Sequence, residues 1–275
     1  MNLNDIGTQL MYITAPIYAI MSDGRISSGT SFFFSINVTE DTAIPLLITN
    51  YHVIENAQQG YVEMHVAENG EPSKTVARIQ FDRSVIQPNK LGNLDLVALP
   101  LAGALNDLQN KRTNLFYKSI DISLLPKRNV IDDLSAIEDI TFIGYPNSIY
   151  DTTNKIPVIR QGITATPIWN NFKGEKEFLI DAGVFPGSSG SPVFIYNKGS
   201  YPTSDGIAIG SRVLFVGILK ETLKRKEAAS TDYLDLGVVI NSSAFFDEIN
   251  KYIIRMTGKP IPRRDEIVPI ETFKE

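Results

Sequence analysis

Short apolar stretches alternate with polar turns along most of the chain, a pattern typical of an all-β protein. Between the first two stretches lies Ser22-Asp23-Gly24-Arg25, whose central Asp-Gly favours a hairpin turn. Residues 102–115 are polar and compatible with a helix, so they are expected to link this half to the next. The strands predicted before this linker are Ile17–Met21, Thr30–Ile36, Leu46–Thr49, Tyr61–Ala67, Lys74–Phe81 and Leu96–Leu101.

The second half repeats the strand pattern and then changes period. Apolar residues recur at helical spacing over Ala244–Met256, with Asn241 or Ser242 as the expected cap. A shorter helix is expected near the start, capped by Asn4 or Asp5. Residues 258–275 contain three prolines and predict an extended or surface-docked tail. The strands predicted here are Tyr117–Leu125, Asp139–Tyr145, Pro157–Trp169, Glu177–Asp181, Val193–Tyr196, Val213–Leu219 and Leu236–Ile240.

Composition narrows the function classes. The 275 residues are 43% hydrophobic and 21% charged, as in ordinary soluble domains. A net charge of −5 argues against nucleic acid or an anionic membrane as the main partner. With no cysteine and two histidines, zinc is not expected, and no other cofactor is indicated. Neither a signal peptide nor a membrane-spanning stretch is recognised, so a cytoplasmic location is expected.

A glycine- and serine-rich stretch carries the first candidate chemistry. It reads Asp181-Ala182-Gly183-Val184-Phe185-Pro186-Gly187-Ser188-Ser189-Gly190-Ser191-Pro192 and leads into an apolar strand. Glycines allow a tight turn that holds one hydroxyl outward. The same turn can aim the amides of Gly187 and Ser189 at one point, as an oxyanion hole requires. The alternative is an ordinary turn between strands.

Two further residues favour the catalytic interpretation. His52 follows an apolar strand, and Asp95 lies within an otherwise apolar stretch. An isolated buried carboxylate is costly, so Asp95 needs a partner, and His52 is the natural one. The order His, Asp, Ser is one of the arrangements that build a Ser-His-Asp triad. Asp139 is the second candidate acid, whereas His65 is expected to be structural or exposed.

Three motifs resemble those of the trypsin-like serine proteases with the chymotrypsin fold, and in particular their bacterial high-temperature-requirement branch. Thr49-Asn50-Tyr51-His52-Val53 resembles the histidine motif of that branch. Asp95-Leu96-Val97-Ala98-Leu99 resembles its aspartate motif, with Val97 shifting the small residue by one position. The stretch from Asp181 to Pro192 resembles its serine motif, with differences at Phe185, Ser188 and Ser191.

The resemblance implies one trypsin-like protease domain over residues 1–275, made of two packed six-stranded antiparallel barrels and a C-terminal helix. The barrels would span about 12–101 and 116–240, the helix 241–257 and the tail 258–275. The peptide-binding domain common in that branch is not recognised. Ser189 would be the nucleophile, His52 the base and Asp95 its orienting acid. Gly187 and Ser189 would form the oxyanion hole, and the substrate-pocket candidates are Gly183, Lys220 and Thr222.

The implied activity is that of a serine endopeptidase acting on proteins or peptides, with a regulatory protein as a possible further partner. The alternatives are a catalytically idle protease fold that serves as a binding module, and an esterase that uses the same triad. Zymogen-forming members place an aspartate directly before the nucleophile, where this chain has Ser188. The basic run Lys224-Arg225-Lys226 is expected to be a solvated loop, with nucleic-acid binding as the lesser alternative.

Overall fold

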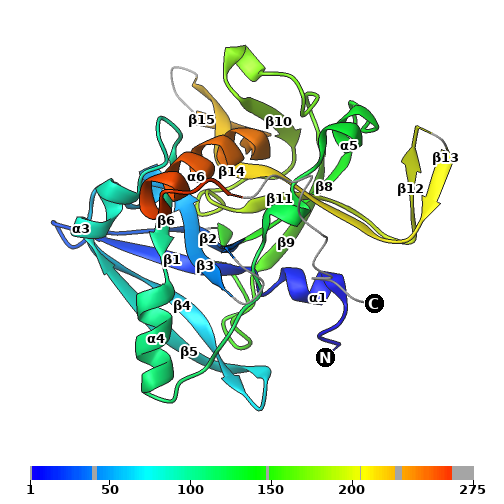
Figure 1. The fold of residues 1–275 in the computed structure, drawn as a ribbon. Coiled ribbons are helices and arrows are strands. Elements are labelled where there is room, and N and C mark those ends of the chain that lie inside the picture. Colours follow the sequence, from blue (N-terminus) through cyan, green and yellow to red (C-terminus); the bar gives the residue numbers. More distant parts are fainter. Residues whose placement is uncertain (1, 39–41, 147–148, 205, 227–230, 262–275) are drawn as a thin grey trace.

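The computed structural model describes residues 2–38, 42–146, 149–204, 206–226 and 231–261 (Figure 1). The first half forms an antiparallel sheet in the order β5-β4-β1-β2-β3-β6, with β7 paired to the end of β4. Its strands are β1 (Thr14–Met21), β2 (Ile26–Asn37), β3 (Ala43–Asn50), β4 (Ala57–Glu68), β5 (Glu71–Asp82), β6 (Leu96–Pro100) and β7 (Leu115–Phe116).

The second half is a closed barrel in which each strand pairs with two neighbours, in the order β10-β15-β14-β11-β8-β9. The prediction of a six-stranded antiparallel barrel is confirmed for this half. Its strands are β8 (Asp139–Gly144), β9 (Val158–Thr164), β10 (Glu177–Asp181), β11 (Pro192–Asn197), β14 (Arg212–Lys226) and β15 (Thr231–Asn241).

The prediction that the first half also forms a closed six-stranded barrel is wrong. This half is an open sheet of seven strands. The chain between β5 and β6 turns through the short helix α3 (Arg83–Ile86) and a 3₁₀ turn at Gln87–Asn89. The side chain of Asp82 accepts a hydrogen bond from the Ser84 amide at 2.8 Å and so ends β5. The edges of β5 and β6 are therefore not joined in a ladder.

The helices lie at the ends and at the junction of the two halves. Asp5 caps α1, Asn241 caps α6, and Gly258 ends α6 in the left-handed conformation that favours glycine. Helix α4 occupies the predicted linker. The remaining helix bounds are α1 (Ile6–Leu10), α2 (Tyr51–Ile54), α4 (Ala102–Asn110), α5 (Arg128–Asp132) and α6 (Ser242–Thr257). Of the predicted tail, residues 262–275 lie outside the described residues.

Two local predictions are wrong, and one element was missed. The segment predicted as the strand Tyr117–Leu125 contains a 3₁₀ turn at Ile122–Leu124, because the Asp121 side chain accepts from the Ser123 amide at 2.7 Å. The basic run belongs to β14, where Lys224 pairs with Tyr233 of β15. A hairpin of β12 (Ser200–Thr203) and β13 (Gly206–Ile209) was not predicted, and it projects from the barrel (Figure 1).

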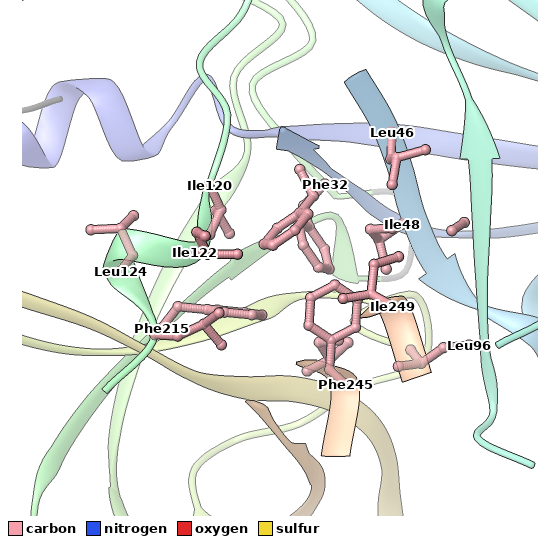
Figure 2. Packing of buried hydrophobic residues seen from close by; sticks show 14 of the residues in the cluster. Phe32, Leu46, Ile48, Leu96, Ile120, Ile122, Leu124, Phe215, Phe245 and Ile249 are labelled. Atoms are coloured by element: carbon pink, nitrogen blue, oxygen red, sulfur yellow. The ribbon is translucent and has the colours of Figure 1, made fainter. Parts of the chain in front are cut away.

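A shared apolar cluster joins the two halves (Figure 2). Phe32 of β2 packs against Phe215 of β14, with ring centroids 5.6 Å apart. Phe245 of α6 contacts both rings at 6.3 Å and 6.0 Å. All three side chains are fully buried. The C-terminal helix therefore closes the core where the sheet meets the barrel, and it fixes the residues of each half relative to the other.

Candidate active site

His52 is positioned by the junction of β3 and β6. Strand β3 ends at Asn50, whose side-chain amide donates to the main-chain oxygen of Asp95 at 2.8 Å. The amide of Tyr51 donates to the same oxygen at 3.1 Å. The chain then forms the single helical turn α2, because Val53 and Ile54 are both buried. These bonds hold the turn that carries His52 beside Asp95.

Asp95 uses both carboxylate oxygens on His52. Its Oδ1 accepts from the main-chain amide of His52 at 2.9 Å, and its Oδ2 lies 2.6 Å from the ring Nδ1. A carboxylate accepts hydrogen bonds, so the neutral ring carries its proton on Nδ1 and leaves Nε2 as an acceptor. The sequence-based pairing of Asp95 with His52 is thus present, with Asp95 placed one residue before β6.

The serine loop, Ala182–Ser191, is built from two tight turns. In the first, Pro186 and Gly187 occupy the central positions, and the Ser188 amide donates to the Phe185 oxygen at 3.0 Å. Gly187 has a φ of 89°, so this is a type II turn, which favours proline followed by glycine. Gly190 has a φ of 90°. A β-carbon there would also lie 2.0 Å from the main-chain oxygen of Thr30, which explains the glycine.

Strands of both halves hold this loop through its backbone. The Thr30 amide of β2 donates to the Ser189 oxygen at 2.9 Å. On the other side, the Gly190 amide donates to the Leu219 oxygen of β14, and the Leu219 amide to the Ser191 oxygen, both at 2.9 Å. The amides of Gly187 and Ser189 have no hydrogen-bond partner within the described residues. Two fixed donors next to the Ser189 side chain are thus available to an external acceptor.

Ser189 and His52 border one open cavity of about 420 Å³. Val184 and Phe185 line it from the serine loop, and Glu221, Thr222 and Leu223 line it from β14. In the part of the chain that the structure covers, no hydrogen bond joins the Ser189 hydroxyl to His52. The structure therefore places the predicted serine and the predicted histidine on the same cavity, with Asp95 bonded to the histidine.

The three substrate-pocket candidates differ in their positions. Thr222 borders the cavity, whereas Gly183 and Lys220 are not among its lining residues. The Arg160 guanidinium occupies the space where a β-carbon on Gly183 would project, at 2.2 Å from that position. Arg160 also stacks on the Phe185 ring at 4.9 Å.

Lys220 forms an ion pair with Glu177 at 2.9 Å. Burial lowers the pKa of Lys220, but its hydrogen bond to Glu177 and the nearby carboxylates of Glu177, Glu221 and Asp95 raise it more, so the net shift is upward. Lys220 is therefore a partly buried cation in a group of carboxylates, and the sequence-based interpretation did not foresee this pairing.

The other sequence candidates lie elsewhere. His65 is on β4, with its ring nitrogens 2.8 Å and 3.1 Å from the main-chain oxygens of Ser73 and Lys155. This fits the predicted structural role. Asp139 begins β8 and is exposed, and the carboxylate bonded to His52 is that of Asp95. Within the described ranges, no group of three or more potential metal ligands occurs, and no helix is long and apolar enough to cross a membrane.

Comparison with known proteins agrees with this architecture. No curated protein matches the chain. Among solved structures, the HtrA-type protease AlgW with tripeptide is similar at 16% identity and a TM-score of 0.51, covering 92% of this chain and 63% of that one. A serine endoprotease from Yersinia pestis is similar at 16% identity and a TM-score of 0.50, covering 91% of this chain and 65% of that one. The chain thus spans less than two thirds of these proteins.

A protein family also matches the chain, and this match rests on the sequence itself. Residues 29–200 match the family described as the trypsin-like peptidase domain. The matched segment contains His52, Asp95 and Ser189 and includes strands from both halves. It covers more than half of the chain, and the chain therefore belongs to the trypsin-like peptidase domain family.

Proposed function

We propose that this protein is a serine endopeptidase whose catalytic residues are Ser189, His52 and Asp95. The observation that carries the proposal is the arrangement around one cavity. A histidine whose main-chain amide and ring each bond one oxygen of the same carboxylate shares that cavity with a serine, and the amides of Ser189 and Gly187 have no partner among the described residues. These are the parts that acyl transfer needs: a base, a nucleophile and anion-binding donors.

In the proposed reaction, Ser189 Oγ attacks the carbonyl carbon of the scissile bond while His52 Nε2 takes the hydroxyl proton. Negative charge that develops on the carbonyl oxygen is bound by the amides of Gly187 and Ser189. The imidazolium then gives its proton to the leaving amine, and the C–N bond breaks to leave an acyl-enzyme. Water then attacks the acyl carbon while His52 takes its proton, the bond to Ser189 Oγ breaks to release the acid product, and His52 returns the proton to Ser189 Oγ. Asp95 keeps the ring oriented and stabilises its charged form.

Labelling with a fluorophosphonate tests this proposal on the uncut chain. We expect one adduct by intact mass, mapped to Ser189, and its loss in Ser189→Ala together with a fall in kcat on the order of 10⁶. Ser188→Ala and Ser191→Ala are matched controls, because both hydroxyls are buried and neither has a hydrogen-bond partner among the residues that the structure describes. They should keep the label. Because Ser188 stands where zymogen-forming members carry an aspartate, we also expect labelling without any N-terminal cleavage.

The same experiment separates the rival functions. A chain that takes no label and turns over no substrate would be an idle protease fold used for binding. A chain that labels at Ser189 but cleaves only esters would be an esterase. Peptide cleavage is favoured because a structurally similar protease is described with a bound tripeptide. If Ser189→Ala kept both the label and normal turnover, the assignment of the nucleophile would be overturned.

Substrate preference can be predicted from the cavity and its surroundings. Arg160 does not line the cavity, but it lies against Gly183 and stacks on Phe185, which does line it, and it has no ion-pair partner among the described residues. Its positive charge should therefore disfavour a Lys or Arg side chain at this end of the cavity. Val184 and Leu223 supply apolar surface on the cavity. We expect small or medium apolar residues before the scissile bond. Cleavage profiling on a peptide library measures this, and a dominant preference for Lys or Arg would contradict it.

A further inference from the structure

Thr30 of β2, which was not predicted from the sequence to be a functional residue, makes two hydrogen bonds to the serine loop. Its amide donates to the Ser189 oxygen at 2.9 Å, and its hydroxyl donates to the Gly187 oxygen at 3.0 Å. The same hydroxyl accepts from the Tyr145 amide at 3.0 Å. One side chain thus connects the first sheet, the barrel and the serine loop.

The surroundings leave this hydroxyl one arrangement. Thr30 is fully buried, and its main-chain oxygen accepts from the Thr49 hydroxyl at 2.8 Å. A β-carbon on Gly144 would lie 2.5 Å from the Thr30 hydroxyl, so the packing around it is close. The hydroxyl has one proton to donate, and with Tyr145 as its donor it gives that proton to Gly187.

We propose that Thr30 is a positioning residue, whose hydroxyl holds the serine loop so that the amides of Gly187 and Ser189 can bind the anion. The inference rests on the proposed peptidase function. It assigns a role in that function to a residue of the first half, although the serine loop belongs to the second half. Thr30 does not contact the cavity; it acts through the peptide that follows Gly187. This peptide, Gly187–Ser188, is the third and last of the type II turn, and the central peptide, Pro186–Gly187, carries the Gly187 amide.

The physical reason lies in the alternatives open to that turn. A type II turn and a type I turn differ by rotation of the central peptide, which here reverses the direction of the Gly187 amide. The Ser188 amide is already bonded to Phe185, so the Gly187 oxygen is the remaining anchor. Without the hydroxyl, the Tyr145 amide would be buried without this partner, and the part-buried Gly187 oxygen would lose its anchor. Rotation of the central peptide then becomes easier, and it would reverse the amide of Gly187, a residue that lines the cavity.

The test compares Thr30→Ser with Thr30→Ala, which differ by one hydroxyl, and adds Thr30→Val, which keeps the shape of threonine. We expect Thr30→Ala and Thr30→Val to lower kcat about 10- to 100-fold with KM within about twofold, because the loss is partial relative to deletion of an oxyanion donor. Thr30→Ser should retain most of the activity. Ser31→Ala is the matched control, since the buried Ser31 hydroxyl donates to the Ala15 oxygen at 2.9 Å and does not contact the serine loop.

A second measurement distinguishes positioning from a general loss of structure. A peptide boronate forms a tetrahedral adduct whose oxygen uses the two amides, whereas the same peptide with hydrogen in place of the boronic acid has no such oxygen. Thr30→Ala should weaken boronate binding by the same factor as kcat/KM and leave binding of the boron-free peptide unchanged. Equal weakening of both ligands, or an activity within twofold of wild type, would overturn the inference.

Failures of folding and of function remain separable. If Thr30→Ala and Thr30→Val both fail to fold while Thr30→Ser folds, the hydroxyl has a structural role only, and the positioning proposal is wrong. If the wild-type protein neither labels at Ser189 nor cleaves peptides, the peptidase proposal itself fails. If the wild type is active and Thr30→Ala is equally active, only the role of Thr30 is refuted.

Discussion

Among single residues, Asp95 shows how backbone and side chain share one task. One carboxylate oxygen binds the main chain of His52 and the other binds its ring. In Asp95→Asn, only one of these positions can still accept, and an NH₂ group would face either the backbone amide or Nδ1. We expect the wrong ring tautomer and a fall in kcat on the order of 10⁴, measured on a peptide substrate. Activity within tenfold of wild type would show that Asp95 does not orient the base.

Gly190 is the residue whose replacement should affect folding most directly. Its φ of 90° is unfavourable for alanine, and an added β-carbon would meet the main chain of Thr30. Gly24 has a similar φ of 83° with nothing within 4 Å of an added β-carbon. We expect Gly24→Ala to cost about 1 kcal/mol of unfolding free energy and Gly190→Ala at least 3 kcal/mol. Urea titrations followed by circular dichroism would measure both, and equal costs would refute the steric argument.

The residues of the candidate site were predictable to different degrees. His52, Asp95 and Ser189 lie in short motifs with chemistry of their own, so the sequence pointed to them. Thr30 has no such signature, because its partner Gly187 is 157 positions away and the bond depends on how the two halves pack. The pairing of Lys220 with Glu177 also lacks a sequence signature, because the two residues are 43 positions apart and strand β15 separates their strands in the barrel.

Among the elements, strands made of consecutive buried apolar residues were predicted best. Apolar runs such as Leu46–Thr49 and Glu177–Asp181 coincide with or lie within observed strands. The hairpin β12–β13 was missed because it has no apolar face toward the core, and Ile209 is 93% exposed. Closure of the first sheet could not be read from the sequence, because it depends on whether the edges of β5 and β6 meet.

Helix α6 is the element on which the junction of the halves depends, and Phe245 is its central contact. Removing this ring leaves a cavity among Phe32, Phe34 and Phe215. We expect Phe245→Ala to lower the free energy of unfolding by about 3–5 kcal/mol. Ile254→Ala on the exposed side of the same helix should change it by about 0.5 kcal/mol. A similar small effect of both substitutions in urea unfolding would show that α6 is not part of the core.

For the whole molecule, the buried tyrosines predict how stability changes with pH. Burial raises the pKa of Tyr12, Tyr18, Tyr117, Tyr145, Tyr196 and Tyr252 above the ordinary value of about 10. The unfolded chain therefore releases these protons first. The stability that they contribute is complete below about pH 10 and is lost as the pH rises above it. Urea unfolding at a series of alkaline pH values would measure this loss.

Tyr145 offers a direct check, because it is almost completely buried and, within the described ranges, its hydroxyl makes one hydrogen bond, of 3.4 Å to the Thr14 oxygen. Tyr145→Phe should leave stability at neutral pH nearly unchanged and reduce its decline above pH 10. A decline as steep as that of the wild type would assign the alkaline sensitivity to other groups.

The division of the site between sheet and barrel also has a consequence for biosynthesis. Translation delivers His52 and Asp95 early, Ser189 much later, and Leu219, which anchors Gly190, later still. Phe245, which closes the shared core, leaves the ribosome after all of these residues. A nascent chain thus contains the chemical groups long before it contains the bonds that align them. The proposed peptidase is expected to be inactive toward neighbouring nascent proteins until the segment that carries Phe245 has been synthesised.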